Sequence, residues 1–231
     1  TGSSARVPRI PGIDGVPYLT SNSALELEDL PRSLLVMGGG YIGIELAQMF
    51  ARAGVDVTLV CRTRLLPETE PEVSAALEDC LRDEGIRIEK GVSYRAVSGT
   101  SQRISLTLER DQETRDLVAE RLLVTTGRRP NTDGLNLEAA GVALTEGGAV
   151  RVDDRLKTTN PRIYAAGDVT GRDMFVYMAA YGSRIAATNA LNGDSLSYDA
   201  TAMPAVTFSD PQVASVGMTE RQARAAGIDV K

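Results

Sequence analysis

The stretch Leu34–Gly54, LLVMGGGYIGIELAQMFARAG, places three consecutive glycines between a short apolar run and a pattern typical of an amphipathic helix. The run 34–37 is apolar throughout, as expected of a strand buried on both faces of a parallel sheet. Apolar side chains then recur at helical spacing over 42–53, and Gly54 marks the helix end. Because the apolar run 55–60 follows, the sequence predicts a strand–helix–strand unit and an α/β fold.

The glycines match the GxGxxG motif, in the position that the motif occupies in dinucleotide-binding folds. Gly38 would permit the tight turn, Gly40 would let the backbone approach a pyrophosphate, and Gly43 would let the helix lie close to the sheet. The diphosphate would lie on free N–H groups at the helix start, where the helix dipole favours negative charge. A glycine turn that serves packing alone is the alternative. The predicted contacts are Gly38, Gly39, Gly40, Tyr41, Ile42 and Gly43.

The end of the second strand indicates which dinucleotide is bound. An NAD-binding unit usually carries Asp or Glu there, to hold the ribose 2′-hydroxyl. This sequence instead has Cys61, followed by Arg62 and Arg64, with no carboxylate before Glu68. Planar guanidinium groups bind phosphate through paired, charge-assisted hydrogen bonds. The two arginines therefore predict a 2′-phosphate and NADPH, unless they are solvated loop charges only.

The middle of the chain continues the α/β pattern. A second amphipathic helix is predicted over 70–84, and segments 86–89 and 103–110 alternate apolar and polar residues like half-exposed strands. The run 122–124 leads into TTGRRPNT, whose RRPN is predicted to be an exposed loop at the carboxyl edge of the sheet, where α/β folds bind ligands. The predicted buried faces of the two helices are Ile42, Leu46, Met49, Phe50 and Ala53, and Val73, Ala76, Leu77, Cys80 and Leu81.

The last third of the chain changes in composition. Residues 147–171, GGAVRVDDRLKTTNPRIYAAGDVTG, predict two short strands separated by a turn at Asn160–Pro161. Asp168 lies between a strand and the helix predicted over 176–191. Its position alone is therefore as compatible with a helix N-cap as with a role in ligand binding. Segment 201–227 predicts one alternating strand and one short helix.

Composition excludes several classes of function. A net charge of -6 argues against a nucleic-acid-binding surface, which normally needs a basic stripe. The sequence contains no histidine, which excludes a histidine general base and a histidine-ligated zinc within these residues. Cys61 and Cys80 form neither a CxxC motif nor a metal pair, and Cys80 is predicted to pack in a helix core. No apolar run reaches the ~18 residues of a membrane span and no signal peptide is evident, so a cytoplasmic location is predicted.

Four motifs together resemble one family. VMGGGYIGIELAQMF, TTGRRPNT, IYAAGDVTG and FSDPQVASVGMTE occur in the order found in flavoprotein disulfide reductases, the group that contains dihydrolipoamide dehydrogenase, glutathione reductase and mercuric reductase. The similarity covers nearly the whole chain. Within the family, FVYMAAYGSRIAATNALNG and TAMPAVTFSDPQVASVG resemble the mercuric reductases most.

The resemblance implies a domain order. In this family a Rossmann-like NADPH-binding domain, a parallel sheet with a β-meander, is inserted in an FAD-binding domain, and an α+β interface domain that forms a homodimer follows. Residues 1–20 would then be the exit segment of a partial FAD domain, 21–130 the NADPH-binding domain, 131–200 the returning part of the FAD domain, and 201–231 the truncated start of the dimerisation domain.

The resemblance also implies individual contacts. Glu45 matches a carboxylate near the nicotinamide, and Tyr41 matches a side chain that can cover the flavin. Asp168 would hold the ribityl chain of FAD, which outweighs the N-cap alternative, and Val176 falls where the flavin ring is contacted. The further residues matched are Gly127 and Arg128 for NADPH and Gly167 for FAD.

The implied reaction is hydride transfer from NADPH to FAD, then transfer of two electrons to a cysteine pair, which in mercuric reductases reduces thiolate-bound Hg(II). The CxxxxC pair and the glycine-rich FAD motif of the family have no counterpart in this sequence, so the sequence is expected to be an inactive piece of a longer protein that still binds NADPH. The alternatives are a dihydrolipoamide dehydrogenase or another disulfide reductase, and a catalytically silent NADPH-binding module.

Overall fold

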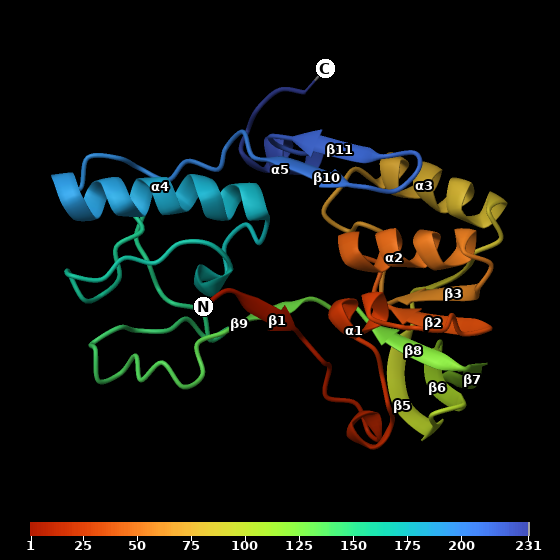
Figure 1. The fold of residues 1–231 in the computed structure, drawn as a ribbon. Coiled ribbons are helices and arrows are strands. Elements are labelled where there is room, and N and C mark those ends of the chain that lie inside the picture. The colour runs from red at the N-terminus through yellow and green to blue at the C-terminus, as the bar shows by residue number, and fades with distance from the viewer. Residues whose placement is uncertain (231) are drawn as a thin grey trace. The chain divides into compact units, whose positions relative to one another are not determined.

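The computed structural model describes residues 1–230 and divides them into two compact units (Figure 1). One unit, which we call the nucleotide unit, comprises Ala5–Gly127 and the described residues from Pro204 onward. The other, which we call the flanking unit, comprises Thr1–Ser4 and Arg128–Met203.

The nucleotide unit is built on a parallel four-stranded sheet in the order β4-β3-β2-β8. Figure 1 shows helices α2 (Tyr41–Arg52) and α3 (Pro71–Asp83) on one face of this sheet and an antiparallel meander, in the order β5-β6-β7, on the other. The predicted α/β fold with a parallel sheet is therefore confirmed. The elements are η1 (Ile13–Gly15), α1 (Ser21–Leu25), β2 (Ser33–Met37), α2 (Tyr41–Arg52), β3 (Asp56–Cys61), α3 (Pro71–Asp83), β4 (Arg87–Lys90), β5 (Ser93–Thr100), β6 (Arg103–Arg110), β7 (Glu113–Ala119) and β8 (Arg121–Val124).

Strand β2 explains the unbroken apolar run in the sequence. Its side chains alternate between two cores: Leu34 and Val36 pack with α2 and α3, whereas Leu35 and Met37 pack with the meander. All four side chains are buried, as predicted for a strand covered on both faces. Strand β6 faces only one core and therefore alternates between buried and half-exposed or exposed positions, which confirms the pattern read over 103–110.

The buried faces of the two helices differ from the predicted ones. On α2, Ile44 and Ala47 are buried whereas Met49 is 42% exposed. The close approach of Gly43 to the sheet turns this side of the helix inward. On α3, the buried face is Ser74, Leu77, Glu78 and Leu81, and it excludes Val73, Ala76 and Cys80, of which Cys80 is half-buried.

Polar residues are accommodated in the buried face of α3 because each has a partner. The Ser74 hydroxyl donates to the Leu65 carbonyl at 2.6 Å. The Glu78 carboxylate accepts from Lys90 at 2.8 Å and pairs with Arg82 at 2.7 Å. Burial without such partners would be costly, so these contacts permit a helix rotation that hydrophobicity alone does not predict.

The described residues from Pro204 onward form a small hairpin and a helix. The sequence predicted one strand here, but two are present, β10 (Pro204–Thr207) and β11 (Val213–Val216), paired antiparallel. Helix α5 (Glu220–Ala225) begins with a capping box between Thr219 and Gln222. This segment is in contact with α2 and belongs to the nucleotide unit.

The flanking unit contains long irregular stretches around one long helix. Its elements are β1 (Ser3–Ala5), β9 (Arg128–Pro130), η2 (Asp168–Thr170) and α4 (Val176–Asn192). The helix predicted over 176–191 is therefore confirmed. Residues 128–130, predicted to be a loop, instead pair with β1 as a short strand, because the N-terminal segment supplies a partner that local sequence does not reveal.

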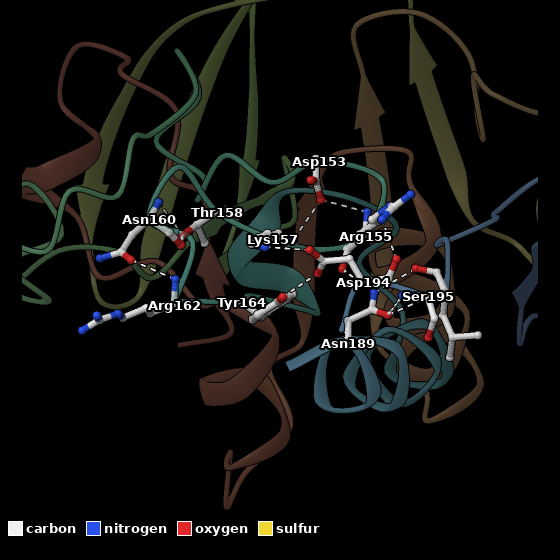
Figure 2. A network of polar contacts seen from close by, with 11 residues as sticks. Asp153, Arg155, Lys157, Thr158, Asn160, Arg162, Tyr164, Asn189, Asp194 and Ser195 are labelled. Carbon is white, nitrogen blue, oxygen red and sulfur yellow. Dashed lines mark hydrogen bonds and ion pairs between the residues drawn. The ribbon is translucent and has the colours of Figure 1, made fainter. Parts of the chain in front are cut away.

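The two strands predicted within 147–171 are absent from the described structure, where only isolated bridges such as Val152–Thr158 are present. Side chains bind the backbone locally instead: the Asp153 carboxylate accepts from the N–H groups of Arg155 and Lys157 (Figure 2). Such bonds compete with a strand ladder. The predicted turn at Asn160–Pro161 is confirmed, with the Ile163 N–H donating to the Asn160 carbonyl at 3.0 Å.

A polar network joins the end of α4 to this irregular segment (Figure 2). The Asn189 amide is buried, donates to the Arg155 carbonyl at 2.9 Å and accepts from the Ser195 N–H at 3.0 Å. The Asp194 carboxylate accepts from Lys157 at 2.6 Å and from the Tyr164 hydroxyl at 2.5 Å. These contacts fix the chain after α4 where apolar packing is sparse.

Candidate functional site

The glycine turn joins β2 to α2 at the carboxyl edge of the parallel sheet. Gly38 has φ 123°, and a Cβ there would lie 2.4 Å from the Thr125 carbonyl oxygen. A Cβ on Gly43 would lie 2.1 Å from the Gly38 carbonyl oxygen. Both glycines are therefore required by packing alone. Gly40 differs, because a Cβ there would meet no atom within 4 Å among the described residues.

The start of α2 fits an anion. Gly40 is the N-cap residue, and within residues 1–230 no side chain caps the helix and no acidic residue lies in its first turn. The first N–H groups of a helix have no intrahelical partner, so those of Ile42 and Gly43 remain for a ligand. The space at Gly40 and the uncapped helix start thus favour a phosphate group over the packing-only alternative.

Tyr41 and Glu45 lie one helical turn apart on α2. Tyr41 is half-buried; its burial, and then the Glu68 carboxylate, raise the pKa of its phenol. The Glu45 carboxylate accepts from the Phe208 N–H at 2.8 Å. The carboxylate that the resemblance placed near a nicotinamide is thus fixed by the segment between β10 and β11.

Cys61 ends β3 directly beneath the glycine turn. Its side chain is 3% exposed, and a Cβ on Gly39 would lie 2.9 Å from the Cys61 Cβ. Burial chiefly, and then the Glu78 carboxylate, raise the pKa of the thiol to about 11. Cys61 is therefore a packing residue at the place where NAD-binding units carry a carboxylate.

We expect iodoacetamide to modify Cys80 before Cys61 in the native chain. Cys80 is half-buried, whereas Cys61 is enclosed and carries a raised pKa, and the thiolate is the reactive form. The native rates should differ by at least about tenfold. Mass spectrometry of the two cysteine peptides measures the rates, and in urea both should react. Equal native rates would show that Cys61 is accessible.

The two arginines after β3 have different surroundings. Arg62 is exposed, and within residues 1–230 its side chain makes no hydrogen bond or ion pair. The Arg64 side chain turns back into its own loop, where Nη2 donates to the Pro67 carbonyl at 2.9 Å and to the Thr69 carbonyl at 2.8 Å. Of the pair predicted to bind a 2′-phosphate, Arg62 is the one that is open to solvent.

Gly127 ends the nucleotide unit with φ 112° and an exposed surface. Arg128 lies in the flanking unit, where Nε donates to the Ser3 hydroxyl at 2.6 Å and lies 3.8 Å from the Asp168 carboxylate. The structure therefore brings Arg128, expected near NADPH, together with Asp168, expected near FAD.

Asp168 does not cap α4, because the N-cap residue of that helix is Phe175. Its carboxylate instead accepts from the Ser3 hydroxyl. Gly167 has φ 75°, and a Cβ there would lie 3.1 Å from the Ala179 side chain. Val176, the first residue of α4, is 84% exposed. The N-cap alternative for α4 is thus wrong, and the three residues matched to FAD lie around the start of α4.

One contact set that the sequence did not reveal holds the 208–210 segment on α2. The Gln48 amide donates to the Asp210 carbonyl at 2.7 Å and accepts from the Asp210 N–H at 2.7 Å. Arg52 pairs with both Glu84 at 2.6 Å and Asp210 at 2.8 Å, and it lowers the pKa of the Glu84 carboxyl. The spacing of Glu45, Gln48 and Arg52 on one helix face was the available signal. We call these three residues and segment 208–210 the helix anchor.

Thr125 was also missed. It follows β8 at the same sheet edge, and its hydroxyl donates to the Met37 carbonyl at 3.0 Å, immediately before the glycine turn. Among the described residues there is no group of three or more potential metal ligands. The helices of the same residues are all too short or too polar to cross a membrane.

Two family profiles match this chain. The profile of the family described as pyridine nucleotide-disulphide oxidoreductase matches residues 1–185. The profile of the dimerisation domain of the same family matches residues 203–231.

Curated relatives include the mercuric reductase of Streptomyces lividans, 49% identical over 228 residues, which cover 99% of this chain and 48% of the relative. The mercuric reductase of Staphylococcus aureus is 46% identical over 232 residues, 100% of this chain and 42% of the relative. The chain thus spans less than half the length of these relatives.

Solved structures include a Cu(II) complex of the HOCl-induced flavoprotein disulfide reductase RclA from Escherichia coli. It matches with a TM-score of 0.89 and 37% identity over 100% of this chain and 53% of that one. LpdA from Mycobacterium tuberculosis matches with a TM-score of 0.87 and 31% identity over 98% of this chain and 49% of that one.

Proposed function

This chain belongs to the pyridine nucleotide-disulphide oxidoreductase family, and we propose that its nucleotide unit binds NADPH for an FAD-dependent oxidoreductase. The observation that carries the proposal is the start of α2, where Gly40 leaves open space beside uncapped N–H groups. Packing accounts for Gly38 and Gly43 but gives no reason for a glycine at position 40. Close approach of a diphosphate would explain a glycine at this position.

Each part of the cofactor has a proposed partner. The N–H groups of Ile42 and Gly43 would hold the diphosphate, because the helix dipole adds to their hydrogen bonds. Arg62 would bind the 2′-phosphate, since no carboxylate at the end of β3 repels it. Tyr41 begins α2 and Glu45 lies one turn later, and there they would face the nicotinamide end.

The flanking unit would contribute to FAD binding. Gly167 lets the backbone lie close to α4, and the Asp168 carboxylate, with Ser3 at one oxygen, is of the right chemistry to accept sugar hydroxyls. Val176 exposes an apolar side chain that suits a ring. When bound, the flavin supplies hydride acceptance and onward transfer of two electrons to a cysteine pair.

For the whole protein we propose a cytoplasmic, homodimeric mercury(II) reductase, a member of a mercury-resistance system, with Hg(II) as substrate. Curated relatives named mercuric reductase support it, and so does the match to a dimerisation domain. A disulfide reductase is the second candidate, favoured by the likeness to RclA. The family's domain order, with boundaries near residues 20, 130 and 200, is part of the proposal. Assays of the full-length protein for NADPH-dependent loss of Hg(II) and of disulfide substrates would decide between the two.

Arg62→Ala should weaken NADPH binding by roughly 1.5 to 3 kcal/mol, the usual range for hydrogen bonds to a charged group, and leave NADH binding unchanged. This equals roughly a tenfold to hundredfold rise in Kd. Fluorescence titration of the 231-residue chain with each nucleotide measures it. Arg103→Ala, which removes an exposed arginine of the meander, is the matched control. Equal affinity of the unmodified chain for NADH and NADPH would refute the assignment of NADPH.

A further inference from the structure

The loop after β3, residues 63–69, packs beneath the glycine turn. Leu65 and Leu66 are almost completely buried, although they lie in a loop. The Leu66 N–H donates to the Gly39 carbonyl at 2.8 Å. A Cβ on Gly39 would lie 3.2 Å from the Leu65 side chain. The position of the glycine turn therefore depends on the conformation of this loop.

Arg64 holds that conformation from within. Its Nη2 joins the Pro67 and Thr69 carbonyls, and so closes the loop on itself. Its Nη1 is buried and has no hydrogen-bond partner among the described residues. A phosphate arriving from solvent cannot reach a buried nitrogen without opening the loop. Arg64 is thus placed to brace the loop and not to meet a ligand.

Two hydroxyl groups support the same loop. Ser74 of α3 donates to the Leu65 carbonyl at 2.6 Å, and Thr69 donates to the Leu66 carbonyl at 2.8 Å. Together with the Arg64 contacts, side chains thus bond the carbonyls of four of the five residues 65–69. A loop fixed by so many side-chain bonds is rigid, and rigidity next to a binding site lowers the entropy lost on binding.

We propose that Arg64 is a positioning residue that holds the 63–69 loop under Gly39, and that Arg62 alone meets the 2′-phosphate. This inference rests on the proposed binding of NADPH and deepens it. Its consequence is that the two arginines have different roles in nucleotide binding. Arg62 would set the preference for NADPH over NADH, whereas Arg64 would set the affinity for the diphosphate that both nucleotides share.

The test compares Arg64→Ala with Arg62→Ala in titrations with NADPH and NADH. Arg64→Ala should raise both Kd values by the same factor, on the order of tenfold, so that their ratio stays within about twofold of that of the unmodified chain. Arg62→Ala should change the ratio instead. Loss of NADPH binding with unchanged NADH binding in Arg64→Ala would overturn the inference, and leave the proposed function standing.

A second variant and a cofactor-free measurement keep the inference testable if Arg64→Ala folds poorly. Ser74→Ala removes one loop contact and should also weaken both nucleotides equally. In the cofactor-free chain, hydrogen exchange at the Leu66 amide, which donates to Gly39, should become faster in either variant. Unchanged exchange would overturn the inference. An unmodified chain that binds neither nucleotide would overturn the proposed function and the part of the inference that concerns ligands.

Discussion

Gly43→Ala should destabilise the nucleotide unit by about 3 kcal/mol, the upper end of the usual cost of overpacking. The added methyl group would lie 2.1 Å from the Gly38 carbonyl oxygen and 2.6 Å from the Thr125 hydroxyl. Neither neighbour moves easily, because the first is backbone in the glycine turn and the second is bonded to the Met37 carbonyl. Urea unfolding followed by circular dichroism measures the change.

Gly40→Ala is the matched control. Gly40 has φ −88°, which any residue adopts, and its missing Cβ faces open space. The variant should lose much less stability than Gly43→Ala, about 1 kcal/mol at most because alanine is a poorer N-cap residue than glycine. It should bind NADPH more weakly, because its methyl group occupies the space proposed for the diphosphate. An equal loss of stability in both variants would contradict this assignment of the glycines. Undiminished NADPH binding by Gly40→Ala would show that the cofactor lies elsewhere.

Gln48→Leu should release segment 208–210 from α2, at a cost of about 3 kcal/mol. The side chain is 4% exposed, and its loss leaves both the N–H and the carbonyl of Asp210 without their partner. Each of the two hydrogen bonds contributes about 0.5 to 1.5 kcal/mol net, so the expected cost lies at the upper end of their sum. Hydrogen exchange at the Asp210 and Phe208 amides should accelerate about a hundredfold, while that of β2 stays slow.

Met49→Ala is the control for Gln48→Leu. Met49 is the next residue, but it is 42% exposed, and its truncation should leave exchange in segment 208–210 unchanged. If Gln48→Leu leaves the Asp210 amide equally protected, the Gln48 side chain is not what holds segment 208–210 on α2.

The strand–helix–strand unit could be predicted from sequence because its signals are local. A wholly apolar strand, glycines and a helical repeat each follow from the backbone and side chains of neighbouring residues. The rotation of α2 could not, since it depends on Gly43 meeting Gly38 and Thr125, and Thr125 is far away in the sequence. Met49 was therefore assigned to the core in place of Ile44 and Ala47.

The candidate site shows the same limit. The sequence does not distinguish Arg62 from Arg64. Only the fold shows that the Arg64 side chain is bonded to carbonyls of the 63–69 loop. In the flanking unit, Asp153 binds its own backbone and so replaces a predicted strand. In each case a polar side chain bonds to nearby backbone, and such bonds cannot be predicted from hydrophobic periodicity.

The enclosure of Cys61 affects how readily its thiol would react with Hg(II), the proposed substrate of the whole protein. Soft metal ions bind thiolates, and burial raises the pKa of the Cys61 thiol to about 11, so the thiol is almost entirely protonated at neutral pH. The Cys61 sulfur is enclosed beneath Gly39 and is almost always protonated, so a metal ion that reacts with exposed thiols would not react readily with it. The sulfur beneath the glycine turn is therefore expected to react with thiol-binding metal ions more slowly than the half-buried Cys80 thiol.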